Sequence, residues 1–141
     1  MFSRTAITRV LSDEPYGQRL HFFRTIDSTN AEAMRLAAEG APEGTLVVAD
    51  EQTAGRGRAG RRWFTPPGSG LAVSLVLRPV LPANQIGHLG LLGGVATVQA
   101  IESLCNLRPK LKWPNDILVN EKKVAGILGE SSHQASGPEW M

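Results

Sequence analysis

Apolar and polar positions along the first half of the chain predict a strand, a helix and a second strand. Residues 20–26 have the composition of a strand. Thr29 and Glu32 match a capping box, in which a hydroxyl begins a helix and an acid three residues later supports it. Gly40 stands where a helix C′ glycine is expected. Residues 45–49 are short and β-branched, which predicts a buried strand.

The second half of the chain begins with a further strand, predicted at residues 71–77. A long stripe of apolar residues at helical spacing follows it. Gly93 and Gly94 lie within this stripe, where they lower helix propensity but permit close packing against a sheet. We therefore expect a central buried helix. Its stripe consists of Ile86, Leu89, Leu92, Gly93, Ala96, Ala100 and Leu104.

Three short strands are predicted near the end of the chain. Residues 110–113 and 117–119 flank Pro114, and a turn at 120–122 returns residues 123–128 as a hairpin partner. The order strand, helix, strand, strand, helix, then three strands is typical of an α+β fold. We expect a mixed, mostly antiparallel sheet backed by helices.

Composition narrows the class of protein. The 141 residues suit one domain and 42% are hydrophobic, enough for a core. Cys105 is the single cysteine, so an internal disulfide is excluded, which fits a reducing cytoplasm. We interpret Cys105 as a small core residue. No apolar run is long enough to predict a membrane span. His21, His88 and His133 share no ligand spacing, so no structural metal is predicted.

The basic character of the chain is concentrated in one segment. The net charge is only +2, yet residues 55–62 contain four arginines and three glycines without an acid, followed by Trp63. Glycines let a backbone approach a ligand, and free N–H groups form a nest for oxygen anions. Arginine adds paired donors that match phosphate and carboxylate. This Gly/Arg loop therefore predicts binding of an anionic or flat ligand.

The spacing of Gly55, Gly57 and Gly60 also matches the dinucleotide-binding fingerprint, but the context does not. That fingerprint begins a helix, whereas Trp63, Phe64 and two prolines follow here. We reject a dinucleotide-binding fold. A basic arm that binds nucleic acid non-specifically is the other interpretation of the loop.

Three further segments could contact a ligand. Lys112-Trp113-Pro114-Asn115-Asp116 places a lysine and an acid around a turn stiffened by proline. The polar run Asp27–Asn30 is explained by helix capping, although it could also bind a polar ligand head. Residues 123–128 are predicted to form an ordinary strand that contains a glycine. The glycine would matter for function only if a flat ligand lay against this strand.

Together these four segments resemble the biotin–protein ligases, in the order of that family. The resemblance covers roughly residues 22–130, which we interpret as a catalytic core between a lead-in at 1–21 and a tail at 131–141. The matching segments are residues 28–30, 52–63, 112–116 and 123–128.

The resemblance implies an α+β domain akin to class II aminoacyl-tRNA synthetases and a reaction in two steps. Biotin and ATP, with Mg²⁺, would give biotinyl-5′-AMP, and a lysine of a biotin carboxyl carrier protein would then accept the biotin. It also implies a cytoplasmic enzyme without a membrane partner, compatible with a homodimer. Nucleic-acid binding is not expected, because there is no room for the DNA-binding domain of some members.

The resemblance also assigns roles to residues. Lys112 and Arg58 are the implied catalytic residues, Lys112 at the biotin carboxylate and α-phosphate and Arg58 as the latch on the adenylate. Nucleotide binding is implied for Arg58, Arg61, Trp63 and Lys112. Biotin binding is implied for Ser28, Thr29, Asn30, Gln52, Arg56, Gly57, Arg58 and Lys112.

Family members continue past the strand at residues 123–128, so the resemblance implies a core shortened at its C-terminal end and an incomplete fold. Two alternatives follow. One is a non-catalytic fragment or binding module, and the other is a lipoate-type ligase.

Overall fold

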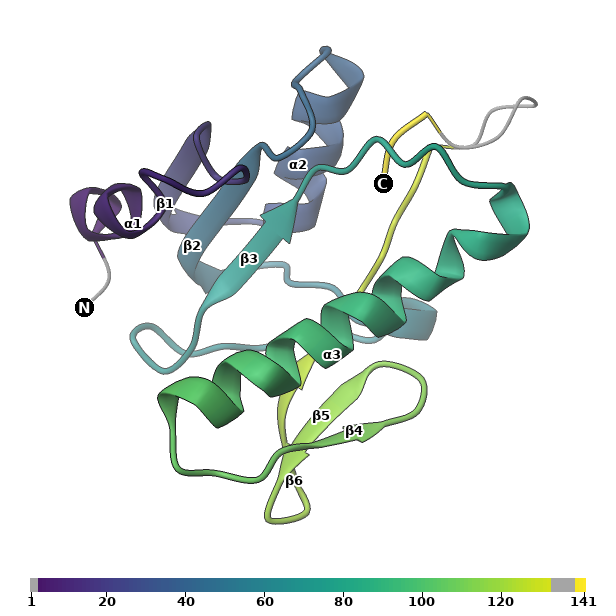
Figure 1. Cartoon of the computed structure of the whole chain (residues 1–141). Helices are drawn as coiled ribbons and strands as arrows, with labels where there is room; N and C mark the ends of the chain where they lie inside the picture. The colour runs from purple at the N-terminus through teal and green to yellow at the C-terminus, as the bar shows by residue number, and fades with distance from the viewer. Residues whose placement is uncertain (1–2, 133–138) are drawn as a thin grey trace. The chain divides into compact units, whose positions relative to one another are not determined.

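The computed structural model describes residues 3–132 and 139–141, and the chain divides into two compact units (Figure 1). Unit 1 comprises Met1–Pro79 with Glu130–Met141, and unit 2 comprises Val80–Gly129. Each unit has a three-stranded sheet of its own. The described part of the chain contains no helix that is long and apolar enough to cross a membrane.

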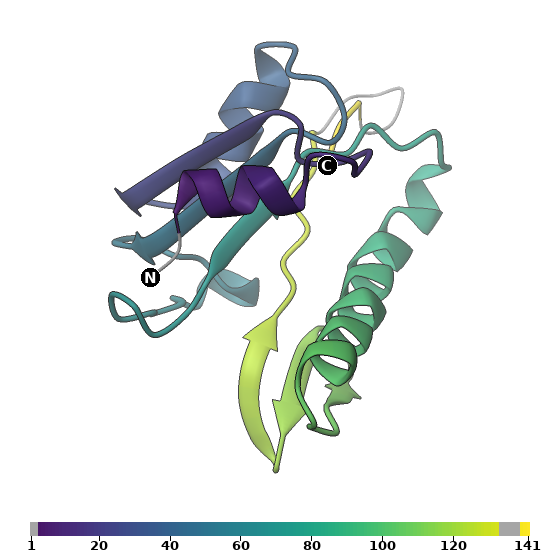
Figure 2. The ribbon, with the colours of Figure 1, turned by 60° about the vertical axis from the view of Figure 1, so that its left-hand side comes forward.

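The sheet of unit 1 is mixed, in the order β1-β2-β3. Strand β1 (Leu20–Ile26) pairs in parallel with β2 (Leu46–Gln52), which pairs antiparallel with β3 (Ala72–Leu75). Parallel neighbours need a crossover, and α2 (Thr29–Ala38) supplies it, packing against β2 and β3 (Figure 2). The predicted strand, helix and strand of this region are confirmed.

The core of unit 1 lies between α2 and the centre of its sheet. Ala33 and Ala37 of α2 pack against Val47 and Val76, all buried. Trp140 packs against this cluster. The division of the chain at residues 21 and 130 stays a prediction.

Unit 2 consists of α3 (Gly87–Leu104) and the antiparallel sheet β4-β5-β6. The strands are β4 (Lys110–Lys112), β5 (Asp116–Val119) and β6 (Lys122–Gly126). A Cβ at Gly94 would lie 2.8 Å from Leu111 Cδ1 and one at Gly93 would lie 3.5 Å from Ile127 Cγ2. Close packing of the helix at these glycines is therefore confirmed, and so is the predicted α+β class.

Burial of the long helix and of the cysteine was predicted wrongly. Among the residues of α3 only Gly94 is buried, while Leu92 and Leu104 are exposed. Helix α3 packs on its neighbouring strands β4 and β5 along one side. Much of the apolar stripe is therefore left open, although Ile86, just before α3, is buried. Cys105, at the C-cap of α3, is exposed rather than in a core.

Two helix starts also differ from the prediction. Ser28, and not Thr29, caps α2, because its side chain accepts a hydrogen bond from the Ala31 N–H. Helix α1 (Arg4–Val10), capped by Ser3, was not predicted, since it has no buried residue that would impose a periodic pattern. Two short 3₁₀ turns complete the elements, η1 (Arg58–Gly60) and η2 (Ala83–Gln85).

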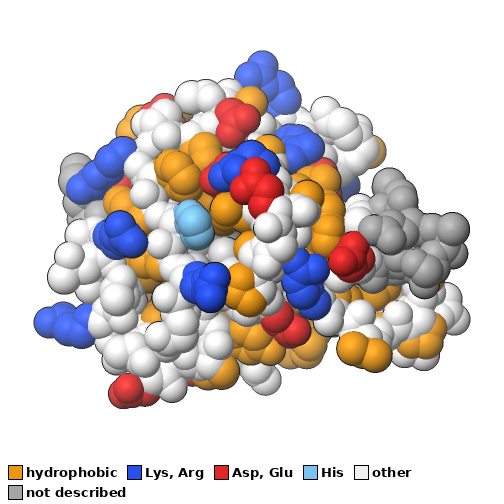
Figure 3. Space-filling model, turned by 90° about the horizontal axis from the view of Figure 1, so that it is seen from above, with side chains coloured by type: hydrophobic (Ala, Val, Ile, Leu, Met, Phe, Trp, Pro, Cys, Tyr) orange, Lys and Arg blue, Asp and Glu red, His pale blue; other side chains and the backbone are white. Residues whose placement is uncertain are grey.

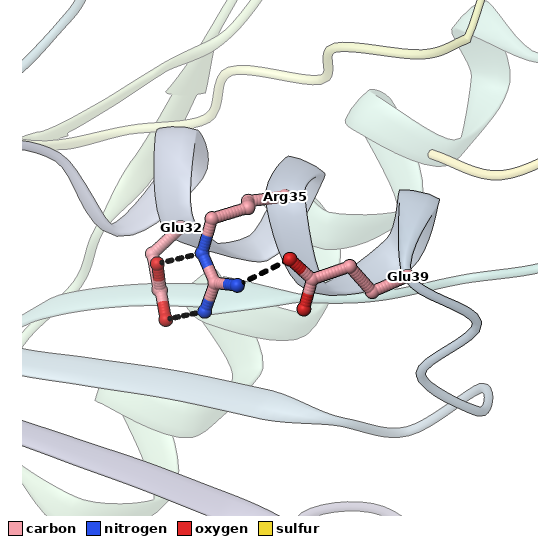
Figure 4. A network of polar contacts seen from close by, with 3 residues as sticks. All are labelled: Glu32, Arg35 and Glu39. Carbon is pink, nitrogen blue, oxygen red and sulfur yellow. Dashed lines mark hydrogen bonds and ion pairs between the residues drawn. The ribbon is translucent and has the colours of Figure 1, made fainter.

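Charges of both signs are interspersed on the molecular face seen in Figure 3, in keeping with the small net charge. On α2, Arg35 binds Glu32 through two nitrogens, at 2.9 and 2.7 Å, and Glu39 at 2.6 Å (Figure 4). The hydrogen bond from Arg35 lowers the pKa of Glu32, and the two carboxylates raise the pKa of Arg35. Such pairs stabilise the helix modestly.

Candidate functional site

Unit 1 gathers buried polar side chains where α2 begins and β2 ends. Ser28 caps the helix, and its own N–H donates to Asp27 Oδ1 at 2.6 Å. Ser28 and Thr29 are each only 3% exposed. Hydroxyl groups that are buried to this extent require hydrogen-bond partners. The partners of the Thr29 hydroxyl come from distant parts of the chain.

Thr29 and Gln52, which are 23 residues apart, are joined directly. The backbone N–H and the hydroxyl of Thr29 both donate to Gln52 Oε1, at 2.8 and 3.0 Å. A backbone N–H can only donate, so the Gln52 oxygen must face Thr29 and its NH₂ group must face away. Two residues to which the family resemblance assigns biotin binding thus lie side by side.

Ser74, on β3, extends this cluster. Its Oγ lies 2.9 Å from Thr29 Oγ1 and also contacts Asn30 Oδ1. Ser74 is 7% exposed. The sequence did not single it out, because its partners lie about 45 residues away and its strand carries no motif.

A carboxylate links the start of α2 to the Gly/Arg loop. Glu130 Oε2 accepts from Asn30 Nδ2 at 2.9 Å, and Glu130 Oε1 lies 3.2 Å from Arg56 Nη1. Sequence reasoning missed Glu130 as well, since a separation of 100 residues from Asn30 gives no local signal. The resulting chain of contacts runs Arg56, Glu130, Asn30, Ser74, Thr29, Gln52; we call it the unit 1 polar network.

The neck of the Gly/Arg loop is fixed by backbone hydrogen bonds. Thr53 N–H donates to Ile26 O and Ala54 N–H to Asp27 O, at 2.9 and 2.8 Å. Trp63 N–H donates to Gly55 O at 2.9 Å. A Cβ on Gly55 would lie 2.6 Å from the Trp63 carbonyl oxygen. Glycine is therefore required here for the two sides of the neck to approach.

The tip of the loop is open by comparison. Arg58, Arg61 and Arg62 are exposed, while Trp63 is half-buried. Gly57 N–H donates to Arg61 O at 2.7 Å, and Ala59 and Gly60 turn the chain with φ of 56° and 71°. The loop thus presents guanidinium groups on a short turn held by a rigid neck.

In unit 2 the segment 112–116 forms a corner between β4 and β5. Asn115 fixes this corner to the end of β6, because its Nδ2 donates to Ile127 O at 3.0 Å and its carbonyl accepts from Ile127 N–H at 2.9 Å. The peptide bond between Trp113 and Pro114 is cis. Lys112 is exposed at the end of β4, so its ammonium group is available to an anion.

Asp116 has a partner on the neighbouring hairpin strand. Lys123 Nζ lies 2.6 Å from the buried Asp116 Oδ1. The sequence predicted the strand that carries Lys123 but did not predict this ion pair, since it depends on the register of β5 against β6.

No group of three histidine, cysteine or acidic side chains that could hold a metal occurs within residues 3–132 and 139–141. His133, one of the three histidines considered above, lies outside the described residues.

Comparison with protein families matches residues 22–137 to the model described as the biotin/lipoate A/B protein ligase family. Among curated proteins, the chain is 49% identical to the bifunctional ligase/repressor BirA of Bacillus spizizenii, over 91% of this chain and 39% of that protein. It is 48% identical to a biotin–[acetyl-CoA-carboxylase] ligase of Paracoccus denitrificans, over 79% of this chain and 46% of that protein. The chain thus spans less than half the length of these relatives.

Solved structures give the same result. A biotin protein ligase from Aquifex aeolicus, in complex with biotin and ATP, matches 82% of this chain and 47% of its own, with a TM-score of 0.70 and 39% identity. The biotin protein ligase of Leishmania major, in complex with biotin, matches 86% of this chain and 53% of its own, with a TM-score of 0.70 and 30% identity.

Proposed function

We propose that this chain, which belongs to the biotin/lipoate A/B protein ligase family, provides the catalytic core of an ATP-dependent biotin–protein ligase. In the first step, a carboxylate oxygen of biotin attacks the α-phosphorus of ATP, which gives biotinyl-5′-AMP and releases pyrophosphate. In the second, the ε-amine of a carrier-protein lysine attacks the acyl carbon, loses a proton and releases AMP.

The observation that carries this proposal is the direct contact between Thr29 and Gln52. It joins two of the motifs that resemble the family, and it does so through buried hydrogen-bonding groups. A ureido ring has N–H donors and a carbonyl acceptor at one edge, and each must find a partner once it is buried. Ser28, Asn30 and the NH₂ group of Gln52 complete a suitable set.

We assign the Gly/Arg loop to the anionic part of the ligand. Arg56 and Gly57 directly follow the neck at Gly55, and we propose that they contact biotin. Arg58 and Arg61 are exposed on the tip, where they can cover the phosphate of the adenylate, and Trp63 can stack near the adenine. Guanidinium groups that close over the mixed anhydride would also exclude the water that hydrolyses it.

We assign Lys112 to the reacting carboxylate and the α-phosphate. Adenylation brings two anions together, so a positioned cation lowers the barrier by reducing their repulsion in the transition state. The exposed Lys112 side chain supplies such a charge. No covalent enzyme intermediate is required by this reaction.

The described residues do not fit a resident metal, because no three-residue cluster of suitable side chains is present among them. Mg²⁺ commonly binds through substrate phosphates with few protein ligands. We therefore place Mg²⁺ with the nucleotide, as part of the ATP substrate, and derive no step from a protein-held metal.

The proposed acceptor is a lysine of a biotin carboxyl carrier domain, the substrate class of a biotin–[acetyl-CoA-carboxylase] ligase such as the relative from Paracoccus denitrificans. A cytoplasmic location follows from this acceptor. A homodimer is a further proposal, which analytical ultracentrifugation with and without biotinyl-AMP would test.

The decisive experiment combines calorimetric titration of biotin with mass detection of biotinyl-AMP after ATP is added. We expect micromolar or tighter binding and accumulation of the adenylate. A chain that binds neither biotin nor biotinyl-AMP at micromolar concentration would refute the proposal. Transfer is then followed with an isolated carrier domain and a carrier whose acceptor lysine is replaced by arginine.

Two controls separate the alternatives. Lipoate in place of biotin gives no adenylate if the ligase is specific for biotin. Nucleic-acid binding through the Gly/Arg loop would weaken steeply as salt is raised, whereas biotin binding, carried mostly by ring hydrogen bonds and apolar contact, would change little.

A further inference from the structure

Glu130 lies where the start of α2 and the neck of the Gly/Arg loop meet. One carboxylate oxygen accepts from the Asn30 amide and the other faces the Arg56 guanidinium. The Glu130 side chain is 25% exposed. A half-buried carboxylate with two different partners constrains both of them.

The first consequence concerns the orientation of the Asn30 amide. An ionised carboxylate only accepts hydrogen bonds, so the Asn30 NH₂ group must face Glu130 and its oxygen must face Ser74. The single proton of the Ser74 hydroxyl is then directed to Asn30 Oδ1. Ser74 Oγ then has no proton left for Thr29 Oγ1, which lies 2.9 Å away and directs its own proton to Gln52 Oε1.

The second consequence concerns the number of protons in the unit 1 polar network. The hydroxyls of Thr29 and Ser74 supply two protons for three contacts, with Gln52 Oε1, with each other and with Asn30 Oδ1. One of the three contacts therefore lacks a proton, and it is the contact between Thr29 and Ser74. The orientation that Glu130 imposes on the Asn30 amide thus decides which contact in the network lacks a proton.

We propose that Glu130 is a positioning residue for the ligand: it sets the direction of the hydrogen bonds through Asn30 and Ser74, and it anchors Arg56 at the neck of the loop. This inference rests on the proposed biotin-binding function. Glu130→Gln tests it, because the substitution keeps the size of the side chain but loses the charge and the obligatory acceptor character.

The first test needs no ligand. Trypsin cleaves after arginine, so release of Arg56 exposes the loop at residues 55–63 to cleavage. In the full chain we expect Glu130→Gln to be cleaved there several-fold faster than the parent. Glu121→Gln is the matched control, because Glu121 pairs with Lys110 at 3.0 Å on the exposed turn of unit 2.

The second test uses biotin as the probe. We expect Glu130→Gln to raise the Kd and KM for biotin roughly tenfold, as expected for a disturbed buried hydrogen-bond network. The adenylation rate at saturating biotin should stay close to that of the parent. In a double-mutant cycle with Asn30→Ala the two effects should be less than additive, because Glu130 acts through Asn30.

The outcomes separate this inference from the proposed function. If the parent binds biotin and Glu130→Gln binds it equally well, the positioning role is wrong and the ligase proposal stands. If the parent does not bind biotin, the ligase proposal fails, and unchanged trypsin cleavage in Glu130→Gln then overturns the anchoring role as well.

Discussion

Thr29 donates both its backbone N–H and its hydroxyl to a single atom, Oε1 of Gln52, at 2.8 and 3.0 Å. Gln52 is the last residue of β2 and Thr29 the first of α2, so the contact ties the end of a central strand to the beginning of a helix. It also turns the Gln52 NH₂ group away from Thr29 and toward Gly55.

Gln52→Ala should weaken biotin binding by about one to two orders of magnitude. The substitution leaves the buried Thr29 hydroxyl without an acceptor and removes one proposed ligand contact, each costing roughly 1–2 kcal/mol. Calorimetric titration measures the effect, with Gln85→Ala as the control, because Gln85 is exposed on the short turn before α3. A Gln52→Ala chain with the parental Kd would remove Gln52 from the site.

Ser28→Ala should lower the free energy of unfolding by about 1 kcal/mol, because the helix loses its N-cap acceptor. Ser28→Asn keeps an acceptor at this position and should lose less. Urea unfolding followed by circular dichroism measures both variants. Equal stability of the parent and Ser28→Ala would contradict the assignment of Ser28 as the cap.

Arg58→Ala should speed the release of biotinyl-AMP about tenfold or more, since one charged contact to a phosphate contributes on the order of 1.5–3 kcal/mol. A filter-retention time course with labelled adenylate gives the dissociation rate. Arg9→Ala, on the exposed side of α1, controls for the loss of a positive charge. If the mutant retains the adenylate as long as the parent does, Arg58 is not the latch.

Lys112→Ala should slow adenylation by about two orders of magnitude while changing the Kd for biotin only slightly, because its charge acts on the transition state. Single-turnover mixing with ATP separates the two quantities. Lys110→Ala is the control from the same strand, with its ammonium group bound to Glu121 instead. An unchanged single-turnover rate would exclude Lys112 from the chemistry.

The ion pair on α2 should make stability depend on pH. Arg35 lowers the pKa of Glu32 below its ordinary value of 4.5, so the folded state binds the Glu32 proton less readily than the unfolded state does. The stabilisation is present above the ordinary pKa and is lost as pH falls through the folded pKa. Thermal unfolding of the parent and Glu32→Gln should differ near neutral pH and converge in acid. A difference that persists in acid would exclude this ion pair as its source.

Local patterns predicted the elements of this chain well. Residues 20–26 were predicted as a strand and form β1 with those bounds. Gly40 follows α2 with a φ of 89°, as a C′ glycine should. The predicted N-cap was wrong by one residue. Serine and threonine both cap helices, and the spacing from Thr29 to Glu32 matched a capping box, so Thr29 was chosen over Ser28. The contact that distinguishes them, from Thr29 to Gln52, is tertiary.

The site was predictable only where a motif marks it. Thr29 and Gln52 belong to segments that resemble a family, and the structure brings them together. Ser74 and Glu130 lie outside any motif that predicted a ligand, and their roles arise from the pairing of β3 with β2 and from the return of the chain to unit 1 after residue 129. Such long-range contacts leave no periodic signature in a sequence.

The two ends of the Gly/Arg loop differ in how much change they tolerate. Any side chain at Gly55 would collide with a backbone carbonyl oxygen, whereas a Cβ at Gly60 meets no atom within 4 Å and only the positive φ of 71° disfavours it. An asparagine tolerates that backbone conformation. The tip should therefore accept a spectroscopic label or a short insertion that reports closure of the loop over a ligand, while the neck stays unaltered.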